Sequence, residues 1–195
     1  MVNNRNLYRY SNEDRVEYLQ PIIIPNHDVV LGIVNYDSNT KIHIINPTNE
    51  KFNPSITDIW LAMGQQVALY ENQQRYGLIH ILYGHTYDFS LCSKNSPELI
   101  VEFIFNTLLT QTGIVCNDQG RVIYPFRLRD DIEGNIRFLV IGIDGDPNKL
   151  KNCGRIHTSF VVHPGDTHPN DWDYDNYIKF LEDYIPNFDQ YIFSL

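Results

Sequence analysis

The stretch from His157 to Asp175 gathers most of the side chains in this sequence that could do chemistry. It contains three of the seven histidines and four aspartates: His157, His163, His168, Asp166, Asp171, Asp173 and Asp175. The segment follows a run typical of a β-strand and precedes a pattern typical of a helix. A strand end positions side chains rigidly and a helix start favours anions, so catalytic loops are common at such a junction.

A metal site is one interpretation of this loop. Imidazole nitrogens and carboxylate oxygens are ligands for Zn²⁺, Mn²⁺ and Fe²⁺. His163, His168 and one of Asp166 or Asp173 could supply three ligands, which would leave an open position where water is activated for hydrolysis. His157 would then be a further ligand or a general base. This pattern indicates a metal-dependent hydrolase as an alternative function, although the spacing matches no established ligand motif.

A structural interpretation of the same loop is favoured. Asn170, Asp171 or Asp173 can cap the helix that follows, because their side chains accept from its first free backbone N–H groups. Pro164, Gly165 and Pro169 are turn residues, and His163 and His168 would be exposed loop residues. We expect caps and turns here more often than catalysis.

Composition and charge point to a protein partner. The 195 residues carry a net charge of −9, and their arginines are interrupted by acidic residues, so nucleic acid is a poor partner. The chain has 13 Tyr, a residue that suits binding surfaces because its ring is apolar and its hydroxyl is polar. The leading hypothesis is an interaction protein, such as an inhibitor, immunity protein or accessory factor, with an acidic, Tyr-rich surface. A structural subunit of a larger assembly is the second alternative.

Several other classes are not indicated. Cys92, Cys116 and Cys153 are odd in number and form no CxxC pair, so we expect reduced thiols. The sequence shows no signal peptide, no apolar run long enough for a membrane span and no nucleotide-binding fingerprint. We therefore expect a soluble, cytoplasmic protein whose cofactor is unknown, a divalent metal entering only under the hydrolase alternative. Whether it is an enzyme, and its oligomeric state, are left open.

The elements that would position this loop follow from periodicity. The runs 29–34 and 41–45 predict two strands joined as a hairpin, and 78–83 with 87–92 predict a second strand pair. Apolar spacing of three and four residues from Asn53 predicts a helix that ends at Gly77. Ser96 and Pro97 begin a second helix, which ends near Gly113 and is apolar nearly all round.

The second half of the sequence is rich in strands. We predict strands at 122–128, where Pro125 indicates an edge or a bulge, at 136–143 in a central position, and at 155–162. A last helix carries Tyr174, Ile178 and Leu181 and stops at Pro186.

Turn-linked strands predict a mostly antiparallel sheet packed with about three helices, which is an α+β fold. The length favours one domain over residues 21–195, preceded by a polar, irregular or weakly helical segment at 1–20.

Overall fold

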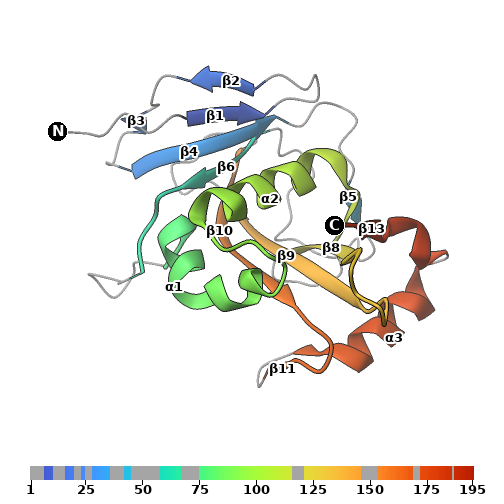
Figure 1. Ribbon diagram of the computed structural model, residues 1–195. Helices are drawn as coiled ribbons and strands as arrows, with labels where there is room; N and C mark the ends of the chain where they lie inside the picture. Colours follow the sequence, from blue (N-terminus) through green and yellow to red (C-terminus); the bar gives the residue numbers. More distant parts are fainter. Residues whose placement is uncertain are drawn as a thin grey trace.

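The computed structural model describes most of the second half of the chain and separate parts of the first half (Figure 1). The described residues are 7–10, 16–19, 23–24, 28–35, 42–44, 58–66, 75–115, 121–145, 153–168, 172–185 and 187–195.

One long mixed sheet and three α-helices make up the described part of the chain. The helices are α1 (Gly77–Ser90), α2 (Pro97–Thr110) and α3 (Tyr174–Tyr184), and a 3₁₀ turn, η1, covers Phe188–Tyr191. The sheet contains β1 (Leu7–Tyr10), β2 (Val16–Leu19), β3 (Ile23–Ile24), β4 (Asp28–Asn35), β5 (Ile42–Ile44), β6 (Asp58–Ala62), β7 (Gly113–Val115), β8 (Arg121–Arg127), β9 (Ile136–Gly145), β10 (Cys153–Val162) and β13 (Phe193–Ser194). The remaining strands, β11 (Thr167–His168) and β12 (Trp172–Asp173), pair with each other.

The sheet runs in the order β2-β1-β4-β6-β10-β9-β8-β7-β5, with β3 on β4 and β13 on β8. Its centre is the antiparallel set β8-β9-β10, and the central position predicted for 136–143 is confirmed by β9. Parallel pairs occur where distant segments meet: β1 with β4, β6 with β10, β5 with β7 and β8 with β13. The other described pairs are antiparallel, so the predicted α+β fold with a mostly antiparallel sheet is confirmed.

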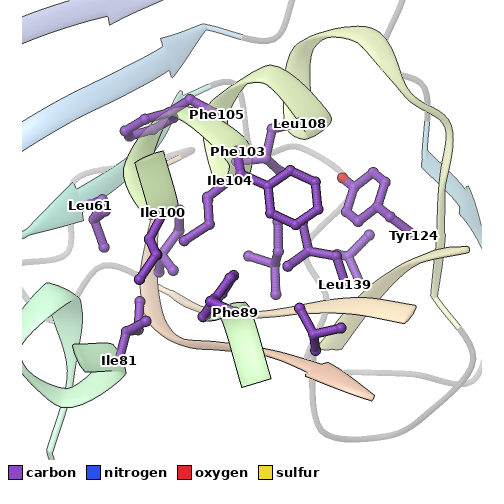
Figure 2. Close-up of a cluster of buried hydrophobic side chains, with 14 of the residues drawn as sticks. Leu61, Ile81, Phe89, Ile100, Phe103, Ile104, Phe105, Leu108, Tyr124 and Leu139 are labelled. Carbon is purple, nitrogen blue, oxygen red and sulfur yellow. The ribbon is translucent and has the colours of Figure 1, made fainter. Parts of the chain in front are cut away.

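The apolar interior lies on both faces of this sheet. Successive residues of a strand point to opposite faces, and β9 shows the division clearly. Leu139 and Ile141 belong to a cluster shared with α1 and α2, whereas Phe138 and Val140 belong to a cluster shared with α3 and η1. Figure 2 shows the first cluster, in which Ile100 and Phe103 of α2 lie over the strands.

Helix α2 begins and packs as the sequence predicts. The backbone N–H of Leu99 donates to the Ser96 hydroxyl oxygen at 3.3 Å, and Pro97 occupies the first helical position. Its most deeply buried residues include Ile100, Ile104 and Phe105, each with no exposed surface. A helix this apolar is stabilised by burial, and the prediction of a core helix is confirmed. The predicted strands at 136–143 and 155–162 and the last helix are also confirmed.

The predicted strand pair at 78–83 and 87–92 is wrong, because α1 covers this segment. Its alternating β-branched residues resemble a strand, but the buried side chains Leu78, Ile81, Phe89 and Cys92 are spaced as on one helix face. Gly77 begins this helix with φ +76° instead of ending an earlier one.

The helix predicted from Asn53 to Gly77 is also wrong over the residues that can be checked. Strand β6 occupies Asp58–Ala62, and its residues Ile59, Trp60, Leu61 and Ala62 are all buried. A continuous apolar run suits a strand that is covered on both faces, and in a short window it cannot be told from a helix by periodicity alone. Residues 53–57 and 67–74 lie outside the described part.

Three smaller predictions also need correction. Strands β4 and β5 do not form a hairpin, since β4 pairs with β1, β3 and β6 while β5 pairs with β7. The segment 1–20, expected to be irregular or weakly helical, contains the antiparallel pair β1-β2. Strand β8 lies inside the sheet rather than at an edge. Pro125 is tolerated there because it has no paired residue in β7 or in β13, so on that side of β8 no ladder partner requires the N–H that proline lacks. The domain boundary at residue 20 stays a prediction.

Candidate functional site

The predicted loop begins at the end of β10 with a hydrogen-bonded turn. The backbone N–H of His163 donates to Asp166 Oδ2 at 2.7 Å, and the N–H of Asp166 donates to the His163 carbonyl at 3.1 Å. Gly165 completes the turn with φ +82°, a conformation that other residues rarely adopt. The carboxylate of Asp166 therefore accepts a hydrogen bond from the backbone, which agrees with the turn predicted at Pro164 and Gly165.

The rest of the loop is closed by backbone pairing. The N–H of Tyr174 donates to the Asp166 carbonyl at 3.3 Å, and the β11-β12 ladder pairs Thr167 with Asp173. The side chains of His168 and Asp173, and all of Asn170 and Asp171, lie outside the described part. The metal site predicted from His163, Asp166, His168 and Asp173 therefore stays a prediction.

His163 faces α1. Its side chain is 9 % exposed, and its Nε2 donates to the backbone carbonyl of Asp88 at 3.1 Å. This bond satisfies one carbonyl in the last turn of α1, where carbonyls have no partner within the helix. The expectation of an exposed loop histidine is wrong for His163.

His157 lies at an irregularity of β10, where the register with β9 shifts between Ile156 and Thr158. A Cβ atom on Gly142 would come within 2.4 Å of the His157 Cε1, so the ring occupies the space that a side chain at position 142 would fill. His157 also lies close enough to His80 to lower the pKa of that residue.

Three half-buried histidines, His80, His85 and His157, form what we call the histidine cluster between α1 and β10. The rings of His80 and His85 meet edge to face with centroids 5.8 Å apart, and the His85 ring lies 5.2 Å from that of Phe160. His80 Nδ1 donates to Gln66 Oε1 at 2.8 Å, and His85 Nδ1 lies 3.3 Å from Asp88 Oδ2. Each of these two rings, when neutral, then carries its lone pair on Nε2.

The electrostatics of the cluster disfavour charge on His80. Burial is the largest cause that lowers the pKa of His80, followed by repulsion from His85, His157 and Arg75. Sequence reasoning treated His80 as a satisfied sheet histidine; it is hydrogen-bonded, but it lies on a helix. No local signal links positions 80 and 157, because the fold alone brings them together.

Neither a ligand set nor an activated thiol is found among the described side chains. No three His, Cys, Asp or Glu residues there are grouped so that they could hold a metal ion. Cys92 is a buried free thiol, and burial raises its pKa to about 11. It remains protonated near neutral pH and is a poor nucleophile.

The outer face of α1 carries an apolar stripe that sequence reasoning missed, since the segment was read as strands. Every fourth residue is a large exposed hydrophobic: Ile79 (39 %), Tyr83 (78 %), Tyr87 (73 %) and Leu91 (46 %). Residues four apart lie on the same helix face, so these four form one continuous surface, here called the α1 stripe. The spacing would have shown it if the helix had been recognised.

The described structure thus defines an α+β protein with a histidine cluster beneath α1 and an apolar stripe on its outer side. Comparisons with protein-family models, with curated proteins and with solved structures returned no match. None of the helices among the described residues has the length and apolar character needed to cross a membrane.

Proposed function

We propose that this protein is an interaction module that binds another protein through the α1 stripe. The observation that carries this proposal is the exposure of Tyr83 and Tyr87, at 78 % and 73 %, on a helix whose opposite side is firmly buried. An inhibitor, an immunity protein or an accessory factor would each need such a surface.

The chemistry of the stripe supports a protein ligand. Tyrosine contributes a large, rigid contact area at small entropic cost and is enriched at interfaces. Apart from histidines, Asp88 is the one charged residue between Gly77 and Ser93, in a chain that is 20 % charged. Depletion of charge distinguishes the centre of an interface from the rest of a surface. A helix that presents large apolar anchors four residues apart suits insertion into an apolar groove.

The charge of the chain indicates the kind of partner. A net charge of −9 attracts a positively charged protein and accelerates its encounter. We therefore expect a basic protein with an apolar groove, and we expect its association rate to fall as salt rises.

The test compares a double variant with a matched surface control. Tyr83→Ser with Tyr87→Ser removes both rings, while Ile132→Ser changes an even more exposed residue (102 %) that lies in the turn between β8 and β9 rather than on α1. A partner is identified from an extract of the source cells, purified, and titrated against all three proteins.

We expect the double variant to bind roughly a hundredfold more weakly, since two anchoring tyrosines contribute on the order of 3 kcal/mol. The Ile132 variant should bind as the unmodified protein does. Equal affinity of the unmodified protein and the tyrosine variant would contradict the role of the stripe. A permanent stoichiometric complex would favour a structural subunit over a regulatory factor.

The metal-dependent hydrolase is a second candidate, supported by the closed loop. Two backbone bonds and the β11-β12 ladder bring the backbones of His163, Asp166, His168 and Asp173 into one short segment. A divalent ion held there would activate water. Elemental analysis of protein purified without chelator tests this, because a stoichiometric metal is required. A melting temperature unchanged by added Zn²⁺ or Mn²⁺ would speak against it.

A further inference from the structure

Strand β10 accompanies helix α1 from the start of the helix to its end, and the two elements pack against each other (Figure 1). Just before the helix, the Arg155 guanidinium lies 4.1 Å from the ring centre of Tyr76. Further along, the ring centres of Phe160 and His85 lie 5.2 Å apart. At the end of both elements, His163 binds the last turn of α1 through the hydrogen bond described above. The position of this last turn therefore depends on the residue that follows β10.

The last turn of α1 leaves one carbonyl without its helical donor. In a regular α-helix each backbone N–H donates to the carbonyl four residues back. The N–H of Cys92 instead donates three residues back, to the Phe89 carbonyl at 3.0 Å. The Asp88 carbonyl, to which Cys92 would donate in a continued helix, accepts from His163 Nε2 at 3.1 Å. His163 thus supplies from outside the donor that the end of the helix lacks.

The His163 side chain is fixed for this task by its own surroundings. A carbonyl oxygen only accepts hydrogen bonds, so the proton of the neutral His163 ring lies on Nε2. The backbone of His163 is held by its N–H, which donates to Asp166 Oδ2 at 2.7 Å, and by the turn that Gly165 completes. The bond to α1 therefore starts from a held backbone and a defined tautomer.

The turn that His163 caps carries half of the α1 stripe. Tyr87 and Leu91 are exposed, and they lie on either side of Asp88 in the sequence. The direction of a helical side chain follows from the backbone of its own turn. Helix ends fray first, because their last carbonyls have no partner within the helix. A donor from outside therefore keeps these two stripe residues in place.

Resting on the binding role proposed above, we propose that His163 is a positioning residue for the α1 stripe. It caps the last turn of α1 and so holds Tyr87 and Leu91 in the arrangement that the basic partner binds. His163 is buried and acts without touching the partner. Its effect on affinity has a simple cause: an anchor that is already ordered loses less conformational freedom on binding, and affinity falls as the ordered fraction of molecules decreases.

Amide hydrogen exchange of the isolated protein tests the cap without any partner. His163→Ala removes the donor, and we expect the amides of Leu91 and Cys92 to lose protection by about five- to tenfold, the effect of one hydrogen bond. The amides of α2 are the internal control, because this helix packs in the same core as α1. An equal loss in both helices, or unchanged protection of the last turn of α1, would overturn the cap.

Two further variants separate the hydrogen bond from the rest of the ring. His163→Gln keeps a side-chain N–H donor but is a poor substitute for an imidazole ligand, so we expect it to restore protection to within about twofold of the unmodified protein. Asp166→Ala changes an exposed residue and should loosen the last turn by a smaller factor, because Asp166 acts only through the backbone of His163. Failure of glutamine to restore protection, or of Asp166→Ala to loosen the turn, would contradict the proposal.

A double-mutant cycle with Tyr87 tests the effect on binding. The probe is the partner protein purified in the test above, titrated at one salt concentration. His163→Ala should weaken binding by about three- to tenfold, and His163→Gln by less than about twofold. In a Tyr87→Ser background the same alanine substitution should have a smaller effect, because the anchor that His163 positions is absent. An equal loss with and without Tyr87 would overturn the positioning role.

These measurements distinguish failure of this inference from failure of the proposed function. If the cap is confirmed but no partner depends on Tyr83 and Tyr87, the binding role fails and His163 is a structural cap alone. If the complex depends on the tyrosines but His163→Ala binds as tightly as the unmodified protein, the positioning role alone fails.

Discussion

Two glycines allow the start of α1 to approach β6 more closely than any other residue would. A Cβ atom on Gly77 would lie 2.7 Å from the Ala62 carbonyl oxygen, and one on Gly64 would lie 1.9 Å from that of Tyr76. Both glycines have positive φ, at +76° and +69°. This crossing fixes where the helix begins and hence where its histidines and tyrosines fall.

Substitution of Gly77 tests this crossing. Gly77→Ala should lower the free energy of unfolding by about 1–3 kcal/mol, because alanine disfavours the left-handed conformation and its Cβ has no space. Gly84→Ala is the matched control, since no atom lies within 4 Å of its added Cβ and φ is ordinary there. We expect that control to be stabilised by about 0.5–1 kcal/mol in urea denaturation. Loss of stability in both variants would argue against a specific role for Gly77.

At the scale of single residues, the sequence identified one part of the site and missed another. The turn at Asp166 could be predicted, because Pro164 and Gly165 encode it locally. The histidine cluster could not, since His80 and His157 meet only after α1 has packed on β10. Residue types alone pointed to the 157–175 loop as the candidate site, because its histidines are close together in sequence.

Secondary-structure elements were predictable where several local signals agreed. Helix α2 has a capping serine, an initial proline and apolar residues around most of its surface. A buried helix is the one kind of secondary structure that accounts for all three signals. In α1 the signals conflict, because alternating isoleucine and histidine resemble a strand while the buried positions have helical spacing. The stretch around Ile59 shows the converse error. Its apolar spacing predicts a helix, but burial within the sheet makes it strand β6.

The energetic weight of α2 in the core can be measured. Phe103 is 4 % exposed and packs edge to face on Phe89 and Phe126, with ring centres 6.3 and 5.6 Å away. Phe103→Ala should cost about 3–5 kcal/mol of unfolding free energy through lost burial and a residual cavity. Leu99→Ala on the same helix, at 39 % exposure, should cost less than about 1 kcal/mol. Similar losses from both, measured by chemical denaturation, would show that α2 is not the core helix.

For the whole molecule, the fold class could be predicted and the strand order could not. Turn-linked apolar runs were enough to indicate an α+β fold with a mostly antiparallel sheet. The pairings of β5 with β7 and of β6 with β10 join segments far apart in the sequence, and no turn specifies them. The expected β4-β5 hairpin is wrong because β4 pairs with β1, β3 and β6, whereas β5 pairs with β7.

The junction of β6 with β10 also has a consequence for biosynthesis. This parallel ladder spans three residue pairs, Asp58–Cys153 to Trp60–Arg155, and residues 63–152 must be translated before it can form. At ribosomal speeds that delay is on the order of ten seconds. Strand β6 can pair with β4 early, but its other edge has no partner until β10 is made, and such an open edge can pair with another chain and aggregate.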